Sequence, residues 1–391
     1  MTREYERPRQ LLPRQSYLDA AWLERERRAL FDRCWVWAGL AGDVAEPGDY
    51  LTTRILDQQL FVLRDDAGDL RAFHNVCRHR GCEVVEGKGN VGKVIRCPYH
   101  RWTYAMSGSL RAVPDEDACF GSVPRERLSL HPASVGVYRG MVYVNPHPEP
   151  PESFDAWIAG MDAHAWPHDL GDGSLTFAGE AVYEMRCNWK VFYENAVDGY
   201  HLGYLHDRTL GPLYPDRNVW RRVGRHAVWY STEREGPPLS NSVLTEQLVD
   251  GAGARRLPGH ESPTYPGVVM LFPLTIFTPN PWGFSVSILE PVDPDTTRMR
   301  SMSWAPEGSR GRFDVSRAPR VVRLGDLATH PLESGDFQIE DMWICEKIQR
   351  NLRSPKFEVG PLADGPGAEG PITHFQRSVL DYVEDGAGGA A

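Results

Sequence analysis

Two Cys–His pairs constrain the fold of this chain more than any other feature of its sequence. Cys77 and His79 are separated by one residue, Cys97 and His100 by two, and the 17 residues 80–96 lie between the pairs. Each pair follows a strand-like run, so two loops each present one thiol and one imidazole. Such a set can hold one zinc ion, or a [2Fe–2S] cluster in which both Cys bind one iron and both His bind the other. The cluster suits the pattern better, because each loop then reaches both irons; the remaining alternative is buried thiols and unrelated histidines.

Charge and cysteine usage narrow the class of protein. The 391 residues include 43 Lys+Arg and 53 Asp+Glu, so the formal net charge is −10. This balance argues against a nucleic-acid partner or an anionic membrane surface, since both need a basic face. The first ten residues lack the apolar core of a signal peptide, and the apolar stretch 267–277 is too short to span a bilayer. Seven thinly spread cysteines suit reduced thiols or metal ligands, so we expect a cytoplasmic protein.

A proline-rich segment, 145–151, marks the clearest domain boundary. Before it, short alternating runs separated by Gly/Asp turns predict a small antiparallel β domain. The expected divisions are 1–33, a helical segment that packs on the catalytic domain; 34–150, the β domain; 151–385, the catalytic domain; and 386–391, a flexible tail.

The run Gly87–Gly92 matches the G-x-G-x-x-G pattern of dinucleotide sites. Such a site requires the run to follow a strand and open a helix. Here Lys93–Arg96 continues as a strand into the second Cys–His pair, so we interpret the run as a hairpin connection. We therefore expect no nucleotide or flavin site in the chain itself, and a metal cluster would receive its electrons from another protein.

A second group of candidate ligands lies in the pattern D-x-x-H-x-x-x-x-H, formed by Asp198, His201 and His206. On a helix predicted over 189–204, Asp198 and His201 lie one turn apart, so the carboxylate can accept a ring N–H of the histidine. His206 reaches the same ion only if the helix loosens or ends between the two histidines, which Gly203 or a π-type bulge permits. The alternative is two solvated or core histidines.

Asp341 is the best candidate for a third ligand. It lies in a helix predicted over 337–352, on an otherwise apolar stripe where a charge needs a partner. A 2-His-1-carboxylate site with open positions is typical of non-haem Fe(II) oxygenases. Glu340 and Glu346 lie off that stripe and are expected in solvent, and Asp336 is expected to cap the helix. A buried salt bridge is the alternative role for Asp341.

The residues around these ligands resemble a known family. Residues 75–82 and 97–102 are similar to the cluster loops of Rieske proteins, in the oxygenase branch. Tyr99 occupies the place of a disulfide-forming cysteine in respiratory-chain members, so no such disulfide is expected and Cys82 is expected to be a small buried side chain. The motifs that follow in order, and that resemble the large (α) subunit of Rieske non-haem iron oxygenases, the aromatic ring-hydroxylating dioxygenase family, are 187–190, 194–206, 340–341 and 349–350.

This resemblance implies an α+β protein with an all-β Rieske domain and a helix-grip-like catalytic domain, whose curved antiparallel sheet takes strands from 266–294. It implies that the Rieske [2Fe–2S] cluster is bound by Cys77, His79, Cys97 and His100, and mononuclear Fe(II) by His201, His206 and Asp341. Catalytic roles are implied for Asp198 and Asn195. Candidate pocket or core residues are Phe272, Ile276, Phe277 and Phe284.

The resemblance also implies partners. Asp198 resembles the carboxylate that links His201 to His100 of the partner subunit in a head-to-tail trimer, to which some members add a small β subunit. An external NAD(P)H-dependent reductase or ferredoxin supplies the electrons. No nucleic acid or membrane is expected to take part.

The implied activity is that of a terminal oxygenase that uses O₂ to mono- or dihydroxylate a small organic substrate. We favour an aromatic substrate on family size. The alternative is a monooxygenase acting on a quaternary amine or an N- or O-methyl group, because 348–354, 360–361 and 374–375 look somewhat like such members and the 12 Trp can supply a cation cage. Arg221 and Arg222 can pair a substrate carboxylate, although such residues are more often surface charges.

Two alternatives belong to other classes: a Rieske electron carrier whose remaining residues are scaffold, and a zinc-stabilised binding protein. Iron analysis of the purified protein separates them. An oxygenase is expected to hold about three irons per chain and an electron carrier about two, because only the oxygenase adds a mononuclear site. A colourless preparation without Rieske absorption would indicate zinc and contradict both.

Overall fold

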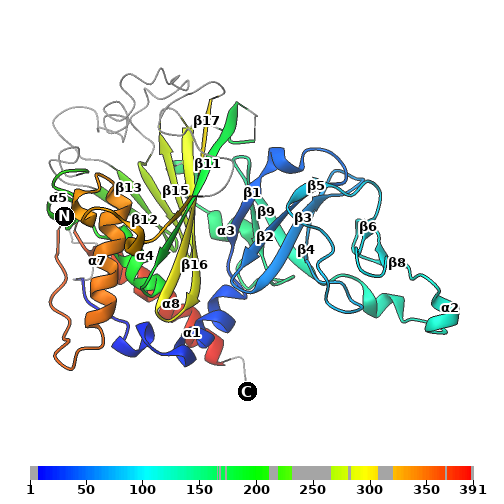
Figure 1. Ribbon diagram of the computed structural model, residues 1–391, viewed down its shortest axis with the longest axis horizontal. Helices are drawn as coiled ribbons and strands as arrows, with labels where there is room; N and C mark the ends of the chain where they lie inside the picture. The colour runs from blue at the N-terminus through cyan, green and yellow to red at the C-terminus, as the bar shows by residue number, and fades with distance from the viewer. Residues whose placement is uncertain are drawn as a thin grey trace. The chain divides into compact units, whose positions relative to one another are not determined.

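The computed structural model describes residues 8–164, 166, 169–171, 174–210, 219–230, 266–280, 283–306, 320–365 and 368–388. The chain divides into two compact units: one of 31–158 with 169–173, called here the β unit, and one of 1–30, 159–168 and 174–391, called the catalytic unit. The β unit is dominated by strands, whereas the catalytic unit joins a twisted sheet to helices (Figure 1). The predicted α+β class is confirmed.

The β unit is built on an antiparallel sheet with the strand order β1-β10-β9-β4-β3-β2-β5. Its strands are β1 (Val36–Leu40), β2 (Asp49–Ile55), β3 (Gln58–Arg64), β4 (Leu70–His74), β5 (Lys88–Asn90), β9 (Pro132–Tyr138) and β10 (Met141–Asn145). A smaller sheet joins β6 (Ile95–Arg96), β7 (Thr103–Tyr104) and β8 (Leu110–Ala112), and the short helices are α2 (Glu116–Cys119) and α3 (Phe154–Ile158). Because β5 lies inside the G-x-G-x-x-G run and pairs with β2, that run opens no helix.

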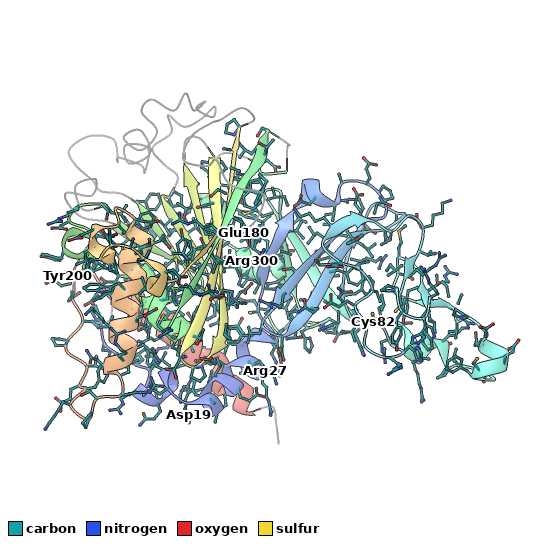
Figure 2. All side chains as sticks on the ribbon, viewed as in Figure 1. Asp19, Arg27, Cys82, Glu180, Tyr200 and Arg300 are labelled. Carbon is teal, nitrogen blue, oxygen red and sulfur yellow. The ribbon has the colours of Figure 1, made fainter. Side chains whose placement is uncertain are left out.

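The sheet of the catalytic unit has the order β12-β13-β14-β15-β16-β17-β11-β18. The bounds are β11 (Leu175–Met185), β12 (Val219–Val223), β13 (His226–Tyr230), β14 (Val268–Leu271), β15 (Thr275–Asn280), β16 (Gly283–Asp293), β17 (Thr296–Pro306) and β18 (Arg320–Val322). The long strands β11, β16 and β17 pair antiparallel, while β18 runs parallel to β11. Glu180 of β11 and Arg300 of β17, labelled in Figure 2, form an ion pair of 2.8 Å across two of these strands.

The helices of the catalytic unit are α1 (Ala20–Glu26), α4 (Trp189–Val197), α5 (Leu202–Leu205), α7 (Phe337–Asn351) and α8 (Gly370–Gly388). Helix α4 contacts α7, α8 and β16, and seven of its nine residues are buried. Helix α8 runs to Gly388, past the start of the tail expected at 386, and 389–391 lie outside the described residues. Among the described residues we find no helix with the length and apolar character needed to cross a bilayer.

A buried ion pair anchors the start of α4. Lys190 Nζ lies 2.7 Å from Glu26 Oε1, and both side chains are fully buried. The indole N–H groups of Trp22 and Trp189 also donate to the Glu26 carboxylate, at 3.0 and 2.9 Å. Asn188 caps the helix by accepting the Lys190 amide. Since a charge left unpaired in this interior would be strongly destabilising, the network fixes α4 against α1.

The N-terminal segment is also tied to α8. Gln376 Oε1 accepts the backbone amides of Leu11 and Leu12, at 2.6 and 3.2 Å. The Gln376 amide group and the Tyr17 hydroxyl both donate to Glu194 Oε1, at 2.7 and 2.6 Å. Burial raises the pKa of Glu194 to about 7. These bonds join segments from the two ends of the chain to α4, which carries Glu194.

Candidate metal centres

Two tight loops of the β unit carry the first group of candidate ligands. The first follows β4 and the second follows β6. The Cys77 amide donates to the Cys82 carbonyl at 2.8 Å, and the Cys97 amide to the Trp102 carbonyl at 2.9 Å, so each loop closes around its cysteine. Gly81 completes the first loop with a φ of +75°, which glycine adopts without strain.

The side chains of these loops lie together. Cys77, Cys97 and Trp102 belong to one buried cluster, the ring of His79 stacks on Trp102 at 4.9 Å, and the His79 and His100 rings are 4.6 Å apart. His79 Nδ1 is buried and has no hydrogen-bond partner in the described part of the chain. Burial raises the pKa of the Cys77 thiol, so this thiol ionises when a cation compensates its charge. Buried thiols beside an unpartnered imidazole nitrogen fit the donor set of a [2Fe–2S] cluster.

Tyr104 contacts this group and was missed from the sequence. Its hydroxyl lies 3.3 Å from Cys77 Sγ and accepts the Arg78 amide at 3.0 Å. The sequence marks Tyr104 only as a polar aromatic residue two positions after Trp102, in the strand β7. Cys82, expected to be buried, is half-buried and directs its thiol to the Glu83 carbonyl. All seven cysteines are free thiols in the structure.

Helix α4 ends before the first candidate histidine. The helix predicted to continue to 204 ends one residue before Asp198, which takes an extended conformation (φ −86°, ψ 110°). Asp198 Oδ1 accepts the Tyr200 amide at 2.7 Å, a local turn that competes with helical hydrogen bonding. His201 and His206 then flank α5, at its N-terminal and C-terminal ends. The predicted break between the two histidines is therefore wrong in position: the chain leaves the helix before both.

One ligand atom from each of His201, His206 and Asp341 lies within 4.8 Å of the others. Asp341 Oδ1 is 3.1 Å from Nε2 of His206 and 3.6 Å from Nε2 of His201, and the two Nε2 atoms are 3.2 Å apart. Asn195 donates to the same Asp341 oxygen at 2.8 Å. Two imidazoles and one carboxylate facing a common point are a donor set that suits ferrous iron.

The outward ring nitrogens of both histidines face carboxylates. His201 Nδ1 lies 3.1 Å from Asp198 Oδ2 and has no hydrogen-bond partner in the described part of the chain, so the contact is an electrostatic one. His206 Nδ1 lies 2.5 Å from Glu340 Oε2, which also accepts the Thr209 hydroxyl at 2.7 Å. Each imidazole can thus keep its proton on Nδ1 and present Nε2 to an ion.

The expectation that Glu340 and Glu346 lie in solvent is wrong. Both are buried, because the segment that carries His206 covers one face of α7 and the chain at Arg186 covers another. The Arg186 amide donates to Glu346 at 3.1 Å. The expected cap is confirmed: the Asp336 side chain accepts the backbone amide of Gln338, two residues further on, at 3.0 Å.

The opposite charges of His201, His206 and Asp341 shift one another's pKa values. Burial acts to lower the pKa of His201, but Asp198 and Asp341 outweigh it and raise the pKa to about 9. The pKa of His206 is raised in the same way, against burial, by Asp341 and Glu340. Burial acts to raise the pKa of Asp341, yet the two imidazoles lower it to about 2. A divalent cation would replace the imidazole protons, so metal affinity should rise with pH.

The aromatic residues proposed for a pocket or core pack as a core. Phe277 and Phe284 lie 5.7 Å apart, Phe284 stacks on Trp304 at 4.8 Å, and Phe272 contacts Phe375 of α8 at 6.1 Å. The remaining candidates are at least partly exposed on the sheet: Ile276, Arg221 and Arg222.

The chain is similar to known proteins over nearly all of its length. Residues 34–131 match the Rieske [2Fe–2S] domain family, and 173–385 match the ring hydroxylating alpha subunit (catalytic domain) family. The glycine betaine monooxygenase oxygenase subunit of Chromohalobacter salexigens is 33% identical, over 95% of this chain and 84% of its own. The carnitine monooxygenase oxygenase subunit of Acinetobacter baumannii is 31% identical, over 95% and 94%. A quaternary ammonium Rieske monooxygenase crystallised with L-carnitine shares the fold, with a TM-score of 0.70 and 24% identity over 95% and 94%.

Replacing Tyr104 by Phe is expected to lower the reduction potential of the cluster by a few tens of mV. A donor 3.3 Å from Cys77 Sγ stabilises the sulfur more when the cluster carries its extra electron. A hydrogen bond to a charged group contributes about 1.5–3 kcal/mol, and because it is present in both oxidation states only part of that energy shifts the potential. For a one-electron couple, about 1.4 kcal/mol corresponds to 59 mV. A redox titration followed by visible absorption measures the shift.

Tyr99→Phe is the matched control, because the Tyr99 side chain is exposed and its hydroxyl accepts from Arg80. Its potential is expected to equal that of the parent protein. An unchanged potential in Tyr104→Phe would contradict the assigned contact.

Proposed function

The chain belongs to the Rieske non-haem iron oxygenases, as a large (α) subunit, and we propose on that premise that it monooxygenates a quaternary ammonium compound. It is an oxygenase whose cofactors are a Rieske [2Fe–2S] cluster and mononuclear iron, and it works with a reductase. The substrate class rests on one observation: 33% and 31% identity, over 95% of this chain, to oxygenase subunits named for glycine betaine and carnitine. These relatives favour the amine alternative over the aromatic substrate expected from family size.

The cluster loops supply two kinds of ligand in this proposal. Cys77 and Cys97 bind one iron through sulfur, and His79 and His100 bind the other through a ring nitrogen. The unpartnered Nδ1 of His79 and the stacking of its ring on Trp102 support this assignment.

His201, His206 and Asp341 hold the mononuclear iron in this proposal. Ferrous iron bound by two imidazoles and one carboxylate keeps open positions and supplies the chemistry that activates O₂ beside a substrate. Asn195 orients Asp341 by donating to Oδ1 at 2.8 Å. The described ion-pair partners of the buried Asp341 carboxylate are the two imidazoles, with no Lys or Arg among them, so a cation bound between the histidines would face this charge directly.

Asp198 connects this site to the surface. It lies 3.1 Å from His201 on the side away from Asp341, and the neighbouring rings of Tyr200 (labelled in Figure 2) and Tyr204 are 56% and 72% exposed. In the β unit, the exposed ring of Tyr99 packs on His100 at 3.7 Å. Exposed tyrosine rings therefore lie beside both residues that are implied to carry electrons, Asp198 and His100. Such exposed aromatic surface supports a head-to-tail homotrimer in which Asp198 contacts His100 of the partner subunit.

A substrate screen tests the function. The purified oxygenase, coupled to a surrogate NADH-dependent reductase, is given quaternary amines (carnitine, glycine betaine, choline) and arenes (naphthalene, benzoate) under ¹⁸O₂. We expect substrate-dependent O₂ uptake with an amine and one labelled oxygen in the organic product. His206→Ala, which removes an iron ligand, provides the uncoupled background. Coupled turnover of arenes alone, with two labelled oxygens, would overturn the substrate proposal.

Asp198→Asn is expected to retain the visible spectrum of the cluster and its reduction by dithionite, yet to lose at least about 90% of turnover. The substitution removes the charge beside His201 and the proposed contact to the partner subunit, without altering a cluster ligand. Asp207→Asn, an exposed carboxylate in the same segment, is the control and should retain activity. Full activity of Asp198→Asn would exclude the proposed bridge.

Light scattering tests the assembly in the same preparations. A homotrimer is expected at about three times the 44.1 kDa mass of the chain. A monomer at assay concentration would contradict electron entry from a partner subunit.

A further inference from the structure

Glu340 and Asp341 are consecutive residues, yet they contact opposite sides of the same imidazole. Asp341 Oδ1 lies 3.1 Å from Nε2 of His206, and Glu340 Oε2 lies 2.5 Å from its Nδ1. Successive side chains on a helix point about 100° apart, so the two carboxylates enclose the ring that projects toward α7. The imidazole is thereby fixed at both nitrogens.

Glu340 is almost completely buried beside the triad. Its side chain is 2% exposed and that of His206 is 1% exposed. Besides His206, Thr209 donates to the same oxygen, at 2.7 Å. No Lys or Arg pairs with Glu340 among the described ion pairs, so the nearest compensation for its charge is positive charge placed on or beyond the imidazole.

We propose that Glu340 is a positioning residue for the mononuclear iron: it holds His206 with its proton on Nδ1 and its lone pair on Nε2, and its charge strengthens the binding of a divalent cation. The inference rests on the iron ligands proposed above. Glu340 and Asp341 together carry two buried negative charges, which match the two positive charges of a ferrous ion. Thr209 fixes the Glu340 oxygen that meets the ring.

The two histidines differ in this respect. The side chains of His201 and Asp198 are 17% and 16% exposed, about ten times more than those of His206 and Glu340. A partly exposed pair can exchange partners at a protein surface, whereas a buried pair keeps one arrangement. Glu340 is therefore expected to act on retention of the metal, and Asp198 on entry of electrons.

Metal affinity, measured without turnover, tests the proposal. Mononuclear iron is removed from the protein while the cluster remains, and Fe(II) is returned anaerobically in competition with a chromophoric chelator. Glu340→Gln is expected to bind Fe(II) about 10–100-fold more weakly, the usual effect of losing a carboxylate behind a histidine ligand. The visible spectrum of the cluster reports in each sample that the protein is folded.

Glu346→Gln is the matched control, because Glu346 is a buried carboxylate on the same helix that accepts from Arg186 and does not contact a histidine. Its Fe(II) affinity should lie within twofold of the parent value. Thr209→Val, which removes the second donor to Glu340, is expected to weaken Fe(II) binding by a few-fold and serves if Glu340→Gln does not fold.

Thermal unfolding separates a positioning role from a structural one. A structural ion pair would lower the melting temperature equally with and without Fe(II), whereas the proposal requires Glu340→Gln to reduce the gain in melting temperature on Fe(II) addition. Parent-like Fe(II) affinity in Glu340→Gln, or in Thr209→Val where the former does not fold, would overturn the inference. Because no substrate is used, this result is independent of the substrate proposed for the enzyme.

Discussion

The geometry of the mononuclear site depends on where helix α4 ends. On an uninterrupted helix, residues five positions apart point about 140° away from each other, so His201 and His206 could not share an ion. Asp198 prevents this by leaving the helical conformation and accepting the Tyr200 amide. The two histidines then flank a single helical turn, and their Nε2 atoms lie 3.2 Å apart. The start of α4 is held by the Glu26–Lys190 pair, so both ends of the helix are determined.

The sequence pattern was sufficient to select His201 and His206, which the structure brings together as candidate ligands, because metal-binding side chains are rare and these two are closely spaced in sequence. It also found Asp341, since a lone carboxylate on an apolar stripe is conspicuous. The sequence pattern gave the wrong environment for Glu340, because a helical pattern shows which face of a helix is polar but not which distant segment covers that face. Here the covering residue is His206, 134 positions away. The pattern misplaced the helix break for a different, local reason: Gly203 has the weaker helix propensity, but the carboxylate of Asp198 offers the competing hydrogen bond to the Tyr200 amide.

Substrate class was the least accessible property from residue patterns. The iron triad is the same whether an arene or an amine is oxidised, so the discriminating side chains must lie elsewhere in the catalytic unit. The aromatic residues singled out from the sequence pack on one another, as Phe284 does on Trp304, and so carry no information about a ligand. The relatives named for glycine betaine and carnitine therefore carry the proposal, through similarity that covers 95% of this chain.

The bonds of Gln376 to Leu11, Leu12 and Glu194 join segments that leave the ribosome at very different times. The catalytic unit takes residues from both ends of the chain, whereas the β unit is nearly continuous in sequence. A ribosome releases the whole of 31–158 well before α8, and domains generally fold as units while the chain emerges. The loops with Cys77 and Cys97 can thus form, and become competent for cluster assembly, while the N-terminal segment still lacks its partner helix.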